Sequence, residues 1–257
     1  MHSTLFTILG VPIRSYGFMM VVGFSLGIWR LIRIAKKQGI NPDYMYDLGL
    51  ISLASGIIGA RLLYILLNLN TISMKEFYKI WDGGLSFHGG VVFAIVAVWL
   101  YCRSKHLNFM QMADLLSPSL AIGYAFTRIG CFLNGCCYGC PTNLPWGVRF
   151  LEDGKLTASS HPTQIYAFIA NIFIFFILTK LENKKLPRGF VFVSYLGLYG
   201  IYRFLVEFLR AGYSAQTAAF GLTQAQLASL IMTAVSALIL IKLKNNSHTV
   251  KDSRRKM

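Results

Sequence analysis

Charged residues are scarce in this sequence, and acidic residues are the scarcest. Only 14% of the 257 residues are charged and only 10 are Asp or Glu, whereas 55% are apolar. This composition excludes an ordinary soluble domain and indicates an integral membrane protein. The aspartates form no cluster of the kind that holds Mg²⁺ for phosphoryl transfer, so we expect catalysis without a metal and without a cofactor. They are scattered over different segments: Asp43, Asp47, Asp82 and Asp114.

Other absences define the organisation of the chain. We find no internal repeat, low-complexity tract or second domain, and we therefore expect a single membrane domain over residues 1–257. No basic residue precedes Arg14, and no short apolar core is followed by small residues at a cleavage position. We therefore expect no removable signal peptide.

Long apolar windows are present instead, and about 20 apolar residues in a helix cross a bilayer core of about 30 Å. We predict an all-α integral membrane protein, a bundle of about seven transmembrane helices. Segment 135–163 contains Pro, Gly and small polar residues, which predict a small extracytoplasmic loop cap made of turns. The predicted spans lie near 16–35, 47–69, 89–102, 115–133, 164–181, 190–209 and 222–242.

Lys and Arg are distributed unevenly between the segments that join the spans. The segments after the first, third, fifth and seventh spans carry 16 of them, and the alternate segments carry 6. By the positive-inside rule the N-terminus is outside and the C-terminus is cytoplasmic. We interpret the net charge of +15 as membrane electrostatics and expect no nucleic-acid partner.

Three basic residues within the spans lie away from the predicted cytoplasmic ends, Arg61, Arg128 and Arg203, and Glu207 follows Arg203 by one helical turn. All four are predicted in the outer half of the membrane. An ionisable group at that depth costs several kcal/mol unless it lines a cavity or has a partner. Arginine binds phosphate oxygens in a fixed fork, so the sequence predicts a site for an anionic lipid headgroup. Alternatively, the arginine side chains extend to the outer headgroups.

His88 is the candidate proton acceptor. The third apolar window has 14 residues, too few to cross the bilayer, and the ten residues 81–90 contain four glycines. We predict that residues 81–90 form an irregular loop that enters the outer leaflet, with His88 at its floor. A neutral imidazole there could accept a proton from a thiol or alcohol nucleophile.

Several motifs, taken together, resemble the bacterial prolipoprotein diacylglyceryl transferases. They are LSFHGG at 85–90, TRIGCFLNG at 127–135, HPTQIY at 161–166 and YRFLVEFLR at 202–210, with shorter matches along nearly the whole chain. The resemblance implies a multi-pass protein of the bacterial plasma (inner) membrane, with phosphatidylglycerol, prolipoprotein signal sequences and membrane lipid as its partners. The implied reaction moves the diacylglyceryl group of phosphatidylglycerol to the lipobox cysteine thiol, forms a thioether and releases glycerol phosphate.

The resemblance also implies roles for individual residues. Arg128 and Arg203 would hold the lipid phosphate and stabilise the departing glycerol phosphate, and His88 would help to deprotonate the thiol. Glu207 would orient Arg203, and Tyr16 would be either catalytic or an interfacial aromatic anchor. The other residues expected at the substrate-binding site are Asn134, Gly139, Arg61 and His161, the last two as structural support.

The sequence departs from the family at three polar positions of its signature, which are cysteines here. With Cys137 they place four of the five cysteines within ten residues, whereas Cys102 is remote. A disulfide or small-residue packing, a soft-metal site, and a redox or acyl-carrying thiol all remain open. Two other functions also remain open: a lipid-modifying transferase with a different acceptor, and a non-catalytic protein that binds or transports an anionic lipid. The three departures are Cys131, Cys136 and Cys140.

Overall fold

The computed structural model of this protein contains seven helices, among its described residues, that are long and apolar enough to cross a membrane. Each predicted span overlaps one of these helices, of which the fourth begins earlier and the seventh ends later than predicted, and the predicted all-α membrane fold is confirmed. The helices are α1 (Ser15–Lys37), α2 (Asp43–Leu67), α3 (Phe87–Ser104), α4 (Phe109–Asn134), α5 (Thr163–Glu182), α6 (Phe190–Glu207) and α7 (Gln224–Arg255). The structure describes residues 4–8, 11–69, 77–78, 84–152, 154–210, 217–219 and 221–255.

Three short antiparallel hairpins, which are not among the predicted elements, accompany the helices in the described residues. They pair β1 (Thr4–Ile8) with β2 (Val11–Arg14), β3 (Leu151–Glu152) with β4 (Lys155–Leu156), and β5 (Thr217–Ala219) with β6 (Leu222–Thr223).

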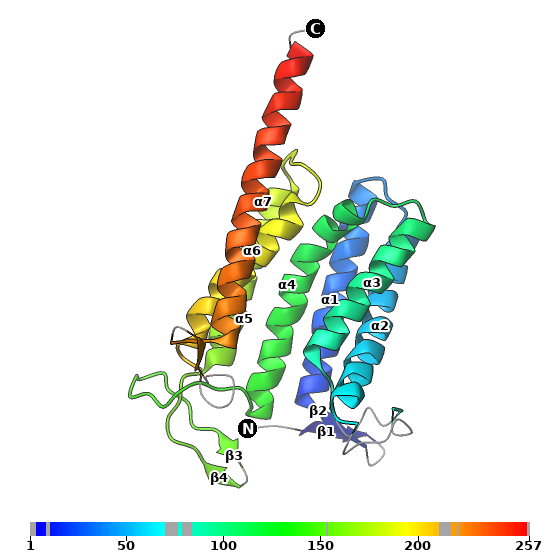
Figure 1. Ribbon diagram of the computed structural model, residues 1–257. Helices are drawn as coiled ribbons and strands as arrows, with labels where there is room; N and C mark the ends of the chain where they lie inside the picture. Colours follow the sequence, from blue (N-terminus) through cyan, green and yellow to red (C-terminus); the bar gives the residue numbers. More distant parts are fainter. Residues whose placement is uncertain are drawn as a thin grey trace. The chain divides into compact units, whose positions relative to one another are not determined.

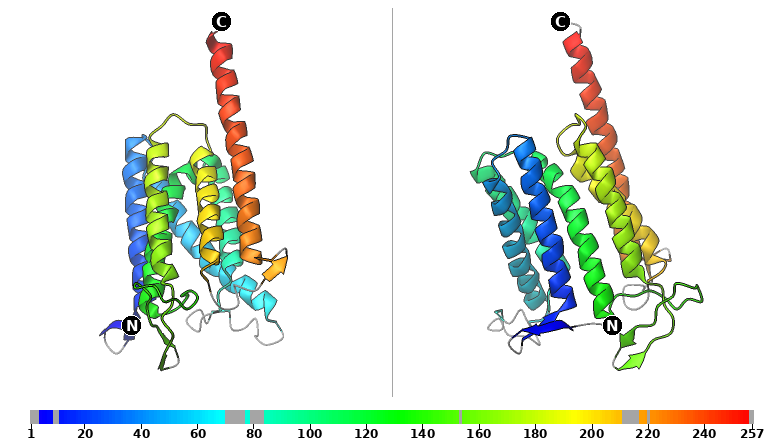
Figure 2. Two further views of the ribbon diagram at one scale, coloured as in Figure 1. Left: turned by 90° about the vertical axis from the view of Figure 1, so that its left-hand side faces the viewer. Right: turned by 180° about the vertical axis from the view of Figure 1, so that it is seen from behind.

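The chain divides into two compact units. The first contains residues 1–29 and 113–257, and the second contains residues 30–112. In the first unit, β1–β2, the end of α4 and β3–β4 lie at one end, and α7 extends past the other end (Figures 1 and 2). The core of this unit lies where α4, α5 and α6 meet, around Ala121, Ile174, Leu178 and Val191.

In the segment predicted as the cap, the described residues between α4 and α5, 135–152 and 154–162, contain no helix. Phe150 is completely buried and organises this segment: its ring stacks on Tyr138, with centroids 4.7 Å apart, and meets Phe132 edge-on. A small aromatic cluster therefore attaches the cap to the last turns of α4.

In the second unit, α2 and α3 pack closely through glycines. A Cβ at Gly90 would lie 3.0 Å from the Gly56 carbonyl oxygen, and one at Gly59 would overlap Phe93. The prediction that the glycines before the third span serve irregular backbone was therefore wrong for Gly89 and Gly90, which lie inside α3 and permit close helix approach.

The predicted position of His88 was also wrong. Helix α3 begins at Phe87 and has 18 residues, about 27 Å of helix, so His88 belongs to its first turn and is not the floor of a loop. Gly84 does adopt a positive φ of 67° shortly before the helix, a conformation that glycine tolerates. The rest of the predicted loop, residues 81–83, lies outside the described residues.

Candidate functional site

Arg128 lies 6 residues before the end of α4 and has a guanidinium group that is only partly satisfied. Its Nη2 donates to the Tyr124 hydroxyl at 2.5 Å, and its Cζ lies 4.6 Å from the centroid of the same ring. Its Nε is buried and has no hydrogen-bond partner in the part of the chain that the structure describes. Because a buried guanidinium N–H without a partner is costly, this atom is an available donor for an anion.

Glu207 is the charged centre of a second group at the end of α6. It is 3% exposed and forms ion pairs with Arg203, one turn earlier, and with Arg210, whose Nε lies 3.7 Å away. Its other oxygen accepts from the Thr223 hydroxyl at 3.2 Å. The prediction that Glu207 lies one helical turn from Arg203 is confirmed, and Arg210 joins them. The buried carboxylate is thus compensated by two cations and a hydroxyl.

Tyrosines connect the two arginine groups. The Tyr124 and Tyr199 rings meet edge-on with centroids 5.6 Å apart. Tyr199 and Tyr202 each lie within electrostatic range of both Arg128 and Arg203. The first unit therefore brings the two predicted phosphate-binding arginines to the same aromatic wall.

Helix α4 ends in a Schellman motif that turns the chain toward these groups. Gly135 has a φ of 76°, its N–H donates to the Phe132 carbonyl at 3.1 Å, and the Cys136 N–H donates to the Cys131 carbonyl at 3.1 Å. This pattern is the usual way to satisfy the last carbonyls of a helix, and it requires a residue that tolerates a left-handed conformation. Asn134, the last residue of α4, is exposed beside the turn.

The loop that follows is held by the HPTQ motif. The Thr163 hydroxyl donates to the Cys137 carbonyl at 2.8 Å, and Gln164 Nε2 donates to the Cys136 carbonyl at 2.7 Å. Both side chains are buried at the start of α5. The motif therefore positions the signature loop through its backbone.

Gly139 lies where three segments meet. Its N–H donates to the His161 carbonyl at 2.8 Å, and it forms a β-bridge with Arg210. A Cβ there would lie 2.8 Å from Thr163 Cγ2 and would overlap the Leu209 carbonyl. Only glycine fits this position, which ties the loop to the end of α6.

His161 and Tyr16 occupy the margins of this group. His161 Nδ1 lies 3.2 Å from the Tyr166 hydroxyl, which accepts from Trp146 Nε1 at 2.8 Å. Tyr16 is 39% exposed in the first turn of α1, and its backbone packs against Gly130 of α4.

The second unit holds the other two predicted site residues. Arg61 is 5% exposed, and its guanidinium donates to the carbonyls of Gly84, at 3.2 Å, and Phe77, at 3.3 Å. It thereby fixes the approach of the chain to α3, where His88 is exposed and its ring meets Phe87. The other seven predicted residues belong to the first unit. How either residue faces Arg128 stays a prediction.

Comparisons with known proteins give the family. The family model described as prolipoprotein diacylglyceryl transferase matches residues 3–242. The chain is 38% identical over 213 residues to a phosphatidylglycerol–prolipoprotein diacylglyceryl transferase of Clostridium tetani, covering 82% of this chain and 86% of that protein. It is 34% identical to proteins of the same name from Finegoldia magna, covering 95% and 96% of the two chains, and Vibrio cholerae, covering 92% and 89%.

The chain belongs to the prolipoprotein diacylglyceryl transferase family. It is a multi-pass bacterial membrane protein, as the seven helices and the family together indicate. The family resemblance proposed from the motifs is confirmed.

Sequence reasoning missed several residues that build this transferase's site. Tyr124 was not singled out, although it lies one turn before Arg128 and a tyrosine at that spacing can reach its guanidinium. Thr223 could have been identified from the sequence as a helix-capping residue, because Thr223 and Gln226 have the spacing of a capping box and form one at the start of α7. The Gln226 N–H donates to the Thr223 hydroxyl at 3.1 Å, and the Thr223 N–H donates to Gln226 Oε1 at 2.9 Å.

The cysteines of this family member are all free thiols. Cys140 donates to the Arg210 carbonyl at 3.0 Å, so it supports the loop. Contacts with the Cys131 and Cys136 thiols, aided by the positive charges of Arg128 and Arg210, lower the pKa of the Cys137 thiol well below its usual value.

Proposed function

We propose that this transferase moves the diacylglyceryl group of phosphatidylglycerol to the lipobox cysteine of a prolipoprotein signal sequence. The names of the relatives state both substrates, and family membership supports the same reaction here. One observation supports the assignment of the site. The guanidinium group of Arg128 packs on Tyr124, and the buried Nε of Arg128 has no hydrogen-bond partner in the described ranges. A lipid phosphate would supply the missing acceptor.

The two arginines would interact with the phosphate in different ways. Arg128 would donate directly from Nε, while Arg203, held by Glu207, would contribute a second positive charge from across the tyrosine wall. Fixed cations placed where negative charge develops stabilise a transition state more than a neutral ground state. Glu207 keeps Arg203 oriented and offsets part of the cost of burying it.

The chemical step would be a substitution at the carbon of the diacylglyceryl group that is esterified to the phosphate. The acceptor thiol loses its proton to a base, for which we assign His88, and the thiolate attacks this carbon. The new C–S bond forms as the C–O bond to phosphate breaks, and the electron pair leaves with glycerol phosphate. The proton from the thiol balances the charge of the released phosphate.

The remaining residues would shape the site. Asn134, exposed at the end of α4, would offer hydrogen bonds to the lipid headgroup, and Tyr16 would line the entrance. Gly139 and His161 would hold the signature loop, and Arg61 would hold the segment that presents His88. The site would face the outside of the plasma membrane, with the C-terminus in the cytoplasm and no nucleic acid involved.

The test is mass spectrometry of a lipobox peptide incubated with the purified full-length protein in vesicles containing phosphatidylglycerol. We expect the peptide cysteine to gain one diacylglyceryl group in a thioether. Arg128→Ala should lower kcat by about 100- to 1,000-fold, the usual cost of removing a donor that stabilises developing charge. His88→Ala should lower it by about 100-fold or more.

The matched control is Arg188→Ala, which removes an exposed arginine from the α5–α6 connection at the opposite end of the first unit. Its activity should equal that of the parent. A parent protein that inserts and folds normally but leaves the peptide unmodified would contradict the reaction, and equal activities of the Arg128→Ala and Arg188→Ala variants would contradict the site.

A further inference from the structure

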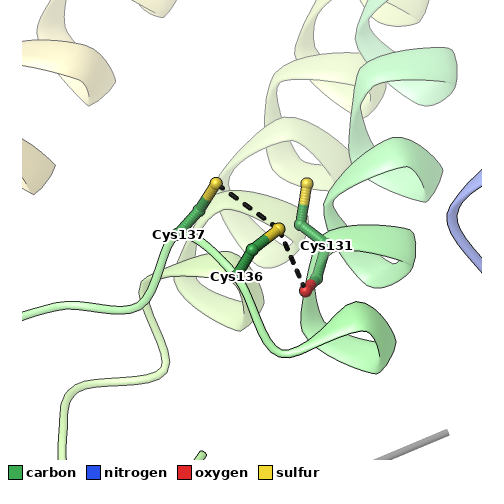
Figure 3. A group of neighbouring side chains, drawn as sticks. All are labelled: Cys131, Cys136 and Cys137. Atoms are coloured by element: carbon green, nitrogen blue, oxygen red, sulfur yellow. Dashed lines mark hydrogen bonds between the residues drawn. The ribbon is translucent and has the colours of Figure 1, made fainter. Parts of the chain in front are cut away.

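Three thiols gather at the end of α4. The Sγ atoms of Cys131, Cys136 and Cys137 all lie within 4.8 Å of one another, and those of Cys136 and Cys137 are 3.7 Å apart. Figure 3 shows that Cys131 comes from the helix and the other two from the loop, with the three sulfur atoms on the same side of the turn. Among the described residues, this is the group whose spacing suits a metal ion.

The geometry of the turn explains why two of the thiols are close together but does not explain the position of the third. Cys131 and Cys136 occupy the two positions of a Schellman motif that normally make an apolar contact, so their proximity follows from the turn. Cys137 is different, since its φ of 67° is unfavourable for a residue with a Cβ. Its carbonyl and that of Cys136 are fixed by Thr163 and Gln164, and its side chain lies against the first two thiols.

We propose that Cys131, Cys136 and Cys137 bind one thiophilic d¹⁰ cation, Zn²⁺, beside the predicted phosphate-binding arginines, through three protein ligands and with an open fourth position. Zinc–thiolate bonds of about 2.3 Å in a tetrahedral arrangement place the sulfur atoms about 3.8 Å apart. The sulfur atoms of Cys136 and Cys137, 3.7 Å apart, already have nearly this separation, and that of Cys131, within 4.8 Å of both, needs a shift of at most about 1 Å.

The charges around the thiols suit such a complex. Binding releases the thiol protons, and Zn²⁺ with three thiolates carries one net negative charge. Arg128 and Arg210, which both lie within electrostatic range of Cys137, offset that charge. Cys131 is buried whereas Cys137 is exposed, so the cation enters from the Cys137 side and a water occupies the fourth position.

A disulfide fits this cluster less well than a cation does. A disulfide joins two sulfur atoms at about 2.05 Å and leaves the third thiol without a partner. A cation binds all three thiols and links the last turn of α4 to the loop that Thr163 and Gln164 hold. It would thereby fix Asn134 and Gly139 without touching the substrate.

The test is titration of the full-length protein, in detergent with a phosphine reductant, with Cd²⁺ and then Zn²⁺. We expect ultraviolet absorption from cadmium–thiolate bonds to saturate at one equivalent and to disappear when Zn²⁺ displaces Cd²⁺. Cys136→Ser and Cys137→Ser should each abolish stoichiometric binding. Zinc should also raise the Tm of the parent and leave the Tm of both variants unchanged.

Two cysteines serve as matched controls. Cys140→Ser removes a thiol of the same loop, and Cys102→Ser removes a buried thiol of the second unit; both should bind one equivalent. Cd²⁺ binding that persists in the Cys131→Ser/Cys136→Ser/Cys137→Ser triple variant would overturn the proposal. So would a parent whose intact mass, measured without reductant from cells, is two hydrogens short and shows a disulfide among these cysteines. Both readouts are independent of transferase activity.

Discussion

At the scale of single residues, this protein places buried polar groups where each has a defined task. Glu207 is neutralised by Arg203 and Arg210 and receives a hydrogen bond from Thr223, so its burial is compensated. Arg128 retains an available donor, which distinguishes a binding group from a structural one. A structural arginine looks like Arg61, whose guanidinium donates to two backbone carbonyls.

Gly139 gives a prediction at this scale. Gly139→Ala should destabilise the protein by about 1–3 kcal/mol, because its new Cβ would collide with the Leu209 backbone and with Thr163. The displaced loop should also lower activity. Thermal unfolding in detergent and the peptide assay measure the two effects. The control is Gly17→Ala in α1, where a Cβ meets nothing within 4 Å; equal stabilities of the two variants would contradict the packing argument.

At the scale of secondary-structure elements, the beginning of one helix is held by a side chain from another helix. The α6 N-terminus is capped by Asp114 of α4, whose carboxylate accepts from the N–H groups of Gly189, at 2.6 Å, and Phe192, at 2.8 Å. Gly189, at φ 87°, supplies no side chain of its own. A carboxylate also suits the positive end of the helix dipole. Asp114 therefore joins α4 to α6 at the end of the first unit opposite Arg128.

Asp114→Ala should lower the free energy of unfolding by about 1–2 kcal/mol, the range for loss of an N-cap. The loss is larger if water does not reach the N–H groups that lose their acceptor. Asp114→Asn should recover part of it, since an amide oxygen still accepts. Asp43→Ala, which removes an exposed carboxylate from the first turn of α2, is the control and should change the Tm little. An Asp114→Ala variant as stable as the control would show that the cap contributes nothing.

At the scale of the whole molecule, the distribution of Lys and Arg predicts how the chain is threaded through the membrane. Lys155 lies on the β3–β4 hairpin of the cap, and Lys184 lies in the α5–α6 connection. These belong to opposite ends of the first unit (Figure 2). The positive-inside rule puts the cap outside and the connection in the cytoplasm.

Labelling of intact cells with a membrane-impermeant maleimide tests this orientation. Lys155→Cys should add label beyond that taken up by the parent cysteines, whereas Lys184→Cys should add label only after the membrane is permeabilised. Additional label on Lys184→Cys in intact cells would reverse the topology and place the proposed site on the wrong side of the membrane.

The sequence by itself determined the number of membrane helices, because each span must satisfy its backbone internally and needs a long apolar window to do so. It also determined the pairing of Arg203 with Glu207, since residues four apart on a helix are neighbours. The motifs determined the family.

Only the tertiary structure decided which groups are satisfied. The guanidinium group of Arg61 donates to carbonyls of residues distant in sequence, which no motif specifies. The donor that Arg128 keeps available depends on its rotamer, which no motif specifies either. The structure likewise decided that His88 belongs to a helix, because the close approach of α2 allows Gly89 and Gly90 to stay helical. Packing between helices outweighs the weak local preference of glycine for irregular backbone.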